Sequence, residues 1–237
     1  LHAPANRIDA RIEVLAGEAP PITQWMPVRL HHAATEVGAR IVLLSDDPIP
    51  PGGHAFAQLV LDQPIAAAVG DRFVLRDTTA QRTIGGGVFL DLRAAARKRR
   101  APERIAQLEA NAIGDPEGAL SALLNCAAGY TDFSVFVRDR AISEAAREAL
   151  AQRMSLLRLV TPKAEFVIAP AVWLRMKKDI LATLAQFHAE NPNLSGIGLE
   201  RLRLQLEPRL PAPAFAALLQ GLARNKDIAL DGAWIRL

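Results

Sequence analysis

Residues 72–90 read RFVLRDTTAQRTIGGGVFL, and this stretch decides the fold expected for the first part of the chain. Charged and apolar residues alternate from Arg72 to Arg76, and a second apolar run covers residues 82–90. A period of two is typical of a strand with one buried face. The polar residues between the two runs favour a turn. The stretch therefore predicts two neighbouring strands.

Four earlier runs carry the same pattern toward the N-terminus. In the first of them, apolar residues alternate with arginine, aspartate and glutamate, as a half-buried strand requires. The runs cover residues 8–14, 27–31, 39–44 and 54–61. Clusters such as Asp46-Asp47-Pro48 separate them and indicate turns. About six short strands without a convincing helix predict a small antiparallel barrel or sandwich over residues 1–92.

Three consecutive glycines, Gly85, Gly86 and Gly87, lie inside the last of these runs. Glycine within a strand pattern marks a bulge or a close approach of two backbones. A phosphate-binding loop of the Walker type is excluded, because the chain contains no GxxxxGK[ST] sequence and no helix is expected after these glycines.

Composition narrows the class of protein. A length of 237 residues suggests two or three small domains, and 50% apolar with 22% charged residues indicates a packed chain rather than a disordered one. No apolar run reaches the roughly 18 residues of a membrane span. One cysteine and no signal pattern favour a cytoplasmic protein without disulfides. Because the chain starts at Leu1 without methionine, we expect it to be a segment of a longer polypeptide.

The net charge of +3 is unevenly distributed. Residues 1–92 carry a net charge of −3, residues 93–110 carry +4, and the remainder carries +2. The positive charge is concentrated in a linker predicted at residues 93–101, which contains Arg97, Lys98, Arg99 and Arg100. Such a segment is typical either of a solvated connection or of a segment that contacts nucleic-acid phosphates, and both interpretations stay open.

From Pro102 onward the period changes to 3.6, which predicts helices. The order of three helices followed by two strands occurs twice, over residues 102–169 and 170–237. This order matches the winged-helix plan. The first helix of the second unit, residues 170–190, is expected to bury Leu174, Leu181, Leu184 and Phe187.

The third helix of a winged helix often binds nucleic acid, so its exposed residues decide between two roles. In the first unit that face offers Arg147, Gln152 and Arg153 beside two glutamates; in the second it offers Gln220, Arg224 and Lys226. Neither set is densely basic, so a spacer or protein-contact role and direct nucleic-acid binding both stay open.

No catalytic or metal-binding residues are expected. His31 and His32 are adjacent in a strand and point to opposite faces, so they cannot bind one metal ion. Cys126 lies in an apolar helical pattern that favours a packed thiol. Because no acid, base and nucleophile converge, the sequence predicts that this chain is not an enzyme and binds no cofactor.

Three stretches resemble a known family. Residues 58–65 read QLVLDQPI, residues 70–77 read GDRFVLRD, and residues 82–87 read RTIGGG. Their order and spacing are similar to the third domain of the bacterial selenocysteine-specific translation elongation factor and, more distantly, of elongation factor Tu. The resemblance implies an antiparallel β-barrel like the third domain of elongation factor Tu, then an arginine-rich segment and the first two of a row of winged helices.

The resemblance also implies a function. The family delivers selenocysteinyl-tRNA to the ribosome at recoded UGA codons; its GTP and magnesium site lies in an N-terminal domain not included here, and the last winged helices, expected beyond Leu237, read a messenger-RNA hairpin. This segment would be a monomer that supports tRNA binding. Its winged helices would act as spacers for the modules that read the messenger RNA. The resemblance implies that the residues in contact with tRNA are Asp77, Thr78, Thr79, Arg82 and Thr83. Their loop lacks the two glycines of elongation factor Tu, which puts the backbone contacts made there in doubt.

One reading from a different class is kept as an alternative. A DNA-binding regulator could combine paired winged helices with a ligand-sensing β-domain. That alternative requires a strongly basic third helix and dimer symmetry, and the sequence supplies neither clearly.

Overall fold

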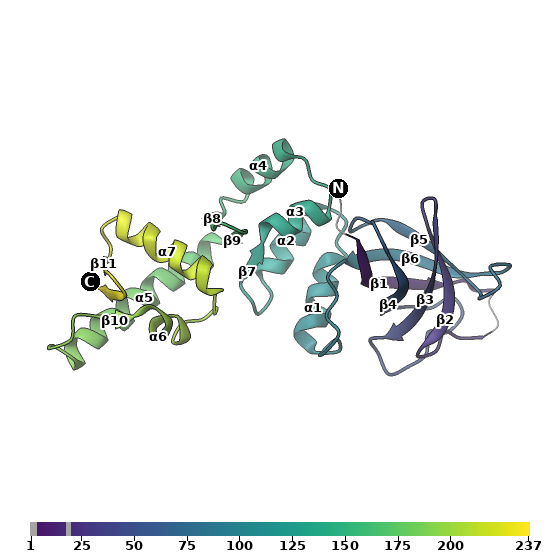
Figure 1. The fold of residues 1–237 in the computed structure, drawn as a ribbon, viewed down its shortest axis with the longest axis horizontal. Coiled ribbons are helices and arrows are strands. Elements are labelled where there is room, and N and C mark those ends of the chain that lie inside the picture. Colours follow the sequence, from purple (N-terminus) through teal and green to yellow (C-terminus); the bar gives the residue numbers. More distant parts are fainter. Residues whose placement is uncertain (1–3, 18–19) are drawn as a thin grey trace. The chain divides into compact units, whose positions relative to one another are not determined.

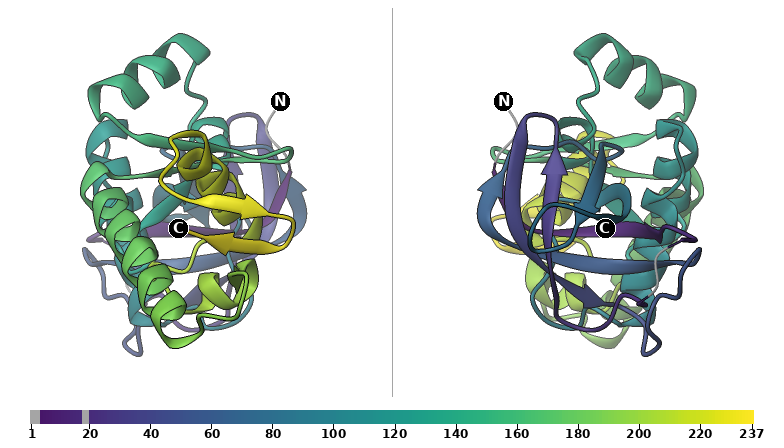
Figure 2. Two further views of the ribbon diagram at one scale, coloured as in Figure 1. Left: turned by 90° about the vertical axis from the view of Figure 1, so that its left-hand side faces the viewer. Right: turned by 90° about the vertical axis from the view of Figure 1, so that its right-hand side faces the viewer.

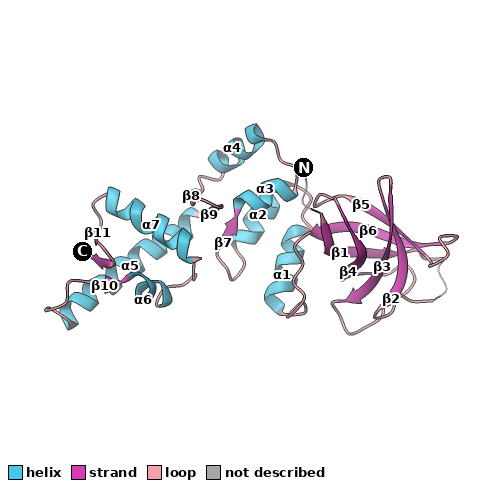
Figure 3. Ribbon diagram, viewed as in Figure 1, coloured by secondary structure: helices cyan, strands magenta, loops and turns pink. Residues whose placement is uncertain are grey.

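The computed structural model describes residues 4–17 and 20–237 of the chain. Six strands come first and are followed by helices and short strands (Figures 1 and 3). The six are β1 (Ala5–Val14), β2 (Met26–His32), β3 (Thr35–Leu43), β4 (His54–Ile65), β5 (Arg72–Arg76) and β6 (Thr83–Asp91). The chain forms two compact units. The first holds the residues up to Ala122 together with Arg138–Ile142, and the second holds Leu123–Val137 and Ser143–Leu237.

The six strands form a closed barrel in the order β1-β4-β3-β2-β5-β6 (Figure 2). Every pairing is antiparallel, and β1 completes the circle by pairing with both β4 and β6. The predicted antiparallel barrel is therefore confirmed. Alternation places Ile8, Ala10 and Ile12 of β1 inside, each fully buried, and larger side chains such as Phe89 of β6 fill the centre.

The glycines of β6 allow its backbone to lie close to both neighbouring strands. A Cβ atom at Gly85 or Gly87 would lie closer than 3.0 Å to a carbonyl oxygen of β1, that of Glu13 or Arg11. A Cβ atom at Gly86 would lie 2.6 Å from the carbonyl oxygen of Phe73 in β5. The close backbone approach predicted for these glycines is therefore present where the barrel closes.

Helix α1 (Pro102–Asn111) packs against the outer face of the barrel. Its residues Leu108 and Ile105 contact Leu44 and Leu90, which point outward from the barrel wall, and Phe56 joins the same cluster. The basic segment before α1 is attached to the wall as well, because the Gln58 side-chain amide donates to the Ala95 carbonyl at 3.0 Å. The boundaries of the predicted linker, residues 93–101, stay a prediction.

A buried polar group fixes α1 to the barrel. Asp9 faces outward from β1 yet is fully buried, and it accepts hydrogen bonds from Gln58 at 2.8 Å and from Arg104 of α1 at 3.0 Å. Arg104 also pairs with Asp91 at 2.7 Å. Burial raises the pKa of the Asp9 carboxyl, and the bonds from Arg104 and Gln58 only partly oppose this. Satisfying so many buried polar atoms holds α1 in one register.

The helical part of the chain repeats one order of elements twice. The three helices and the two final strands of each set were predicted, and the short strand after the first helix was not. The first set is α2 (Pro116–Leu124), β7 (Tyr130–Asp132), α3 (Phe133–Asp139), α4 (Glu144–Arg153), β8 (Leu157–Val160) and β9 (Glu165–Ile168). The second set is α5 (Pro170–Glu190), β10 (Ile197–Gly198), α6 (Leu199–Leu204), α7 (Ala212–Arg224), β11 (Ala229–Asp231) and β12 (Trp234–Arg236). Each set forms one three-stranded sheet with its last strand in the middle, β7-β9-β8 and β10-β12-β11.

Two local predictions need correction. Leu174, expected on the buried stripe of α5, is 65% exposed, and the buried stripe is formed by Met176, Ile180, Leu184 and Phe187. Met176 is two positions from Leu174, which places the two side chains on nearly opposite faces of the helix. Cys126 lies in the turn that follows α2 rather than in a helix, and it is partly exposed.

Within residues 4–17 and 20–237, no helix combines the length and the apolar character that crossing a membrane requires.

Candidate nucleic-acid interface

The hairpin between β5 and β6 carries all five residues expected to contact tRNA. Asp77 organises its turn: the carboxylate accepts hydrogen bonds from the Thr79 hydroxyl at 3.0 Å, the Gln81 N–H at 3.0 Å and the Arg82 N–H at 3.3 Å. Partial desolvation would raise the pKa of Asp77, but these bonds outweigh it and lower the pKa. Asp77 is therefore ionised, and its carboxylate stabilises the turn through these hydrogen bonds.

The donors left over in this turn point outward. Thr78 and Thr79 are exposed, and within the described part of the chain neither backbone N–H has a hydrogen-bond partner, nor does the Thr78 hydroxyl. Arg82 is also exposed, and its positive charge lowers the pKa of Asp77. Thr83 begins β6 and is half-buried. The hairpin thus presents N–H and hydroxyl donors beside the positive charge of Arg82, and such groups bind phosphate oxygens.

A groove of about 700 Å³ begins beside Thr83 and follows the outer face of β1, β5 and β6. Gly85, Gly86 and Gly87 contribute no side chains to its lining, and Arg11 and Arg72 flank it. Arg11 pairs with Glu13 at 3.1 Å, whereas Arg72 is exposed and has no ion-pair partner among the described residues. Arg72 is a candidate that the sequence interpretation did not single out, although its alternation with Phe73 marks it as outward-facing.

The basic segment after β6 is less free than its sequence suggests. Arg93 binds the buried carboxylate of Asp139 through two bonds of 2.9 Å. Arg100 donates to the Leu43 carbonyl at 3.2 Å and pairs with Asp46. These two arginines are therefore neutralised by the barrel unit itself.

Arg97, Lys98 and Arg99 differ in how far they are available to a ligand. Arg99 donates to the Ala96 carbonyl at 2.8 Å and holds a second guanidinium nitrogen buried without a partner. Arg97 and Lys98 are exposed, and no hydrogen bond or ion pair engages their side chains within the described residues. Of the four cations predicted as phosphate contacts, these two are the ones that face solvent freely.

The hairpin and the basic segment do not form one surface. The hairpin precedes β6 and the basic segment follows it, and nine residues of strand span about 30 Å. The segment then crosses β4 and β3, where Gln58 and Leu43 bind it. In the barrel order, β4 and β3 lie across from β5 and β6. An RNA duplex bound at the hairpin would therefore have to span the length of β6 and the width of the barrel to contact Arg97 and Lys98 as well.

In the first winged helix, Glu165 of β9 binds Arg147, one of the two arginines that were considered for nucleic-acid binding. Its carboxylate is 3% exposed and pairs with Arg147 of α4 and with Arg158 of β8. Burial alone would raise the pKa of Glu165, but the two guanidinium groups outweigh burial and lower it. Glu144 and Glu148 pair with the same two arginines at 2.7 Å each. This face carries no surplus of positive charge.

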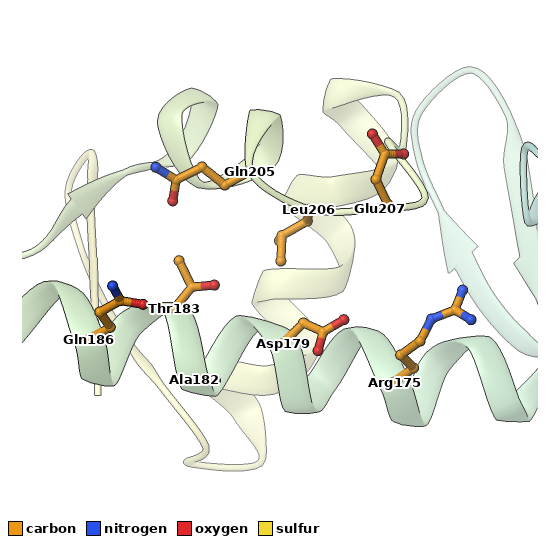
Figure 4. A pocket seen from close by; sticks show the side chains of 8 residues that line it. All are labelled: Arg175, Asp179, Ala182, Thr183, Gln186, Gln205, Leu206 and Glu207. Carbon is orange, nitrogen blue, oxygen red and sulfur yellow. The ribbon is translucent and has the colours of Figure 1, made fainter.

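The second unit contains a groove of about 460 Å³ between α5 and the segment after α6. Figure 4 shows Arg175, Asp179 and Gln186 projecting from α5 toward Gln205 and Glu207 on the opposite side. One arginine and two carboxylates line the groove, so its charge does not favour a phosphate ligand. Gln220, Arg224 and Lys226, predicted on the third helix and just after it, are exposed.

Within residues 4–17 and 20–237, no group of three or more histidine, cysteine, aspartate or glutamate side chains could hold a metal ion.

Comparison with known families finds matches to two parts of the chain. Residues 9–96 match the family described as "Selenocysteine-specific elongation factor, beta-barrel domain". Residues 181–237 match the family described as "Elongation factor SelB, winged helix". The first match covers nearly the whole barrel but ends at residue 96, before Arg97, and the second covers most of the second repeat.

Individual proteins agree with these families. The selenocysteine-specific elongation factor of Escherichia coli K12 is 32% identical over 92% of this chain, and that of Haemophilus influenzae is 23% identical over 99%. The chain spans about a third of the length of each, 33% and 36%. A solved bacterial selenocysteine-specific elongation factor superposes with a TM-score of 0.59 over 99% of this chain and 34% of its own, and at 14% identity it supports the fold alone.

Proposed function

Because this chain contains the β-barrel and winged-helix domains of the selenocysteine-specific elongation factor family, we propose that it supports tRNA binding during delivery of selenocysteinyl-tRNA to the ribosome at recoded UGA codons. GTP hydrolysis in such a factor requires a nucleotide-binding domain. The two families that match this chain describe a barrel and a winged helix, so the role proposed for these residues is binding rather than catalysis.

The observation that carries this proposal is the β5–β6 hairpin. The Asp77 carboxylate accepts hydrogen bonds from the Thr79 hydroxyl and from two backbone N–H groups, and these bonds fix the turn. The remaining donors, on Thr78 and Thr79, are left facing solvent, and the exposed Arg82 adds a positive charge beside them. Donors fixed in advance bind phosphate and 2′-hydroxyl groups at a lower entropic cost, and double-stranded RNA is recognised mainly through these groups.

Arg97 and Lys98 have a separate part in the proposal. They lie across the barrel from the hairpin, so we assign them to another stretch of RNA, belonging to the ribosome or to a distant part of the tRNA. Two exposed cations contribute a sequence-independent and salt-sensitive attraction. Arg99 and Arg100 support the local structure of the same segment.

The first winged helix fits the role of a spacer in this proposal. A DNA- or RNA-reading third helix needs unpaired basic side chains, whereas Arg147 of α4 is held by Glu144 and the buried Glu165. The same pairing counts against the alternative of a DNA-binding regulator. We therefore assign the reading of a messenger-RNA hairpin to other modules of the factor.

Titration of a tRNA acceptor and T-stem hairpin RNA tests the proposal. We expect binding on the order of 10 to 100 micromolar, because sequence-independent phosphate contacts are weak at physiological salt. Arg82→Ala should reduce the slope of log affinity against log salt by about one phosphate contact. Fluorescence anisotropy at several salt concentrations measures both quantities.

The matched control is the double variant Arg97→Ala/Lys98→Ala, which removes more charge from the far side of the barrel. It should leave the slope for the short RNA unchanged. A loss of slope in the double variant together with none in Arg82→Ala would assign RNA binding to the basic segment and overturn the role of the hairpin.

A further inference from the structure

The wing of the second winged helix exposes a tryptophan. Strand β12 lies in the middle of the sheet β10-β12-β11, and Ile235 at its centre is 2% exposed and points into the core. Because side chains alternate along a strand, Trp234 and Arg236 point to the opposite, outer face. Trp234 is 50% exposed. Figure 2 (left) shows the hairpin of β11 and β12 in yellow. The fold leaves half of a large aromatic surface in water.

The space beside the indole is open. Gly198 of β10 pairs directly with Trp234, and no atom lies within 4 Å of the position that a Cβ atom would take there. Within the described part of the chain, the indole side chain of Trp234 makes no ring, cation–π or hydrogen-bond contact. One flank of the ring is therefore free to accept a flat group of similar size.

The charge around the wing is mainly positive. Arg236 shares the outer face with Trp234 and pairs with Ala229 of β11. Lys226 lies three residues before Ala229. Arg224 ends α7 immediately before this turn. All three cations are exposed and lack an ion-pair partner among the described residues. Of the two nearby carboxylates, Asp227 is neutralised by Lys177 at 2.6 Å, and Asp231, paired with Trp234, is exposed, so the three cations outnumber the one uncompensated carboxylate.

We propose that this wing binds unpaired nucleotides of RNA, with a base stacked on Trp234 and neighbouring phosphates held by Arg236 and Lys226. The proposal rests on the function proposed above, because it takes the ligand to be RNA. Every base has a flat π face, so an open aromatic ring beside cations binds single strands without reading sequence. The positive charge favours a polyanion over a second copy of this chain, and the edge strands, two and three residues long, are too short to template strand pairing.

A labelled oligouridylate of about eight nucleotides tests the proposal. Stacking of one base on an aromatic side chain is worth about 1–3 kcal/mol, so Trp234→Ala should weaken binding by about 5- to 150-fold. Trp234→Phe, which keeps a ring, should restore most of the affinity. Trp25→Ala is the matched control: this tryptophan is 48% exposed on the barrel unit, and its replacement should leave the affinity unchanged.

Two further measurements separate the outcomes. In a chain that keeps Trp234 but carries Trp25→Phe and Trp173→Phe, saturating oligouridylate should quench the indole emission, which needs no destabilising variant. The acceptor and T-stem RNA should bind Trp234→Ala as it binds the unaltered chain, so failure of the wing and failure of the hairpin are distinguishable. Unchanged oligouridylate affinity in Trp234→Ala, absent quenching, or a dimer that dissociates in Trp234→Ala would each overturn the proposal.

Discussion

Gly87→Ala should destabilise the barrel by about 3 kcal/mol or more, because the added methyl group meets backbone. Its Cβ atom would lie closer than 3.0 Å to the Arg11 carbonyl oxygen and 2.9 Å from a ring carbon of Phe73. Relief requires β6 to move away from β1, the pair that closes the barrel. Urea unfolding together with amide hydrogen exchange in β1 and β6 measures the loss.

Gly114→Ala is the matched control for this change. Gly114 belongs to the same unit, and no atom lies within 4 Å of its would-be Cβ position. Its replacement should leave stability within about 0.5 kcal/mol of the unaltered chain, as for most surface changes. Equal stability of the two variants would contradict the close approach of β6 and β1.

Glu165→Ala should destabilise the second unit by about 3 kcal/mol. Removing one partner of a buried ion pair leaves the other charge poorly compensated, and here Arg147 and Arg158 both lose their buried carboxylate and keep only the more exposed Glu144 and Glu148. Glu200→Ala is the control, since Glu200 forms an exposed pair with Arg203. Its removal should change the unfolding midpoint little, because exposed pairs are screened by water.

The effect of Glu165 should also depend on pH. Its pKa is lowered in the folded chain, so the carboxylate contributes stability above its ordinary pKa of about 4.5, and this contribution falls as pH drops through the folded value. The difference in unfolding free energy between the unaltered chain and Glu165→Gln should therefore be largest near neutral pH and shrink below about pH 4.5. A difference that grows on acidification would contradict the assignment of an ionised Glu165.

The barrel could be predicted from the sequence because each of its strands carries a local pattern of alternating residues. Each run alternates over five residues or more and is bounded by turn residues, and all six predicted runs are strands. Strands β7 and β10 were missed because they are three and two residues long, too short to show any period. The misplaced Leu174 has a similar cause: a long helix that is apolar on more than one side offers two plausible stripes.

The candidate site was predictable only in part. The hairpin residues were identified by resemblance, but the internal role of Asp77 depends on the turn geometry. The state of the basic segment depends on partners far away in sequence, since Arg100 meets Asp46 across 54 positions and Arg104 meets Asp9 across 95. Sequence alone indicates a cluster of positive charge and cannot tell which members the fold neutralises.

Chemical-shift mapping of the amide groups during titration with the acceptor and T-stem RNA tests the central claim most directly. Contact through the hairpin predicts that the largest shifts fall on Thr78, Thr79, Arg82 and Thr83 and saturate together, with a midpoint that rises with salt. The chemical shifts of the amide groups of Arg97 and Lys98, across the barrel, should not change. Shifts confined to the winged-helix repeats, or shifts along the basic segment with none in the hairpin, would contradict the assignment of tRNA binding to the β5–β6 hairpin.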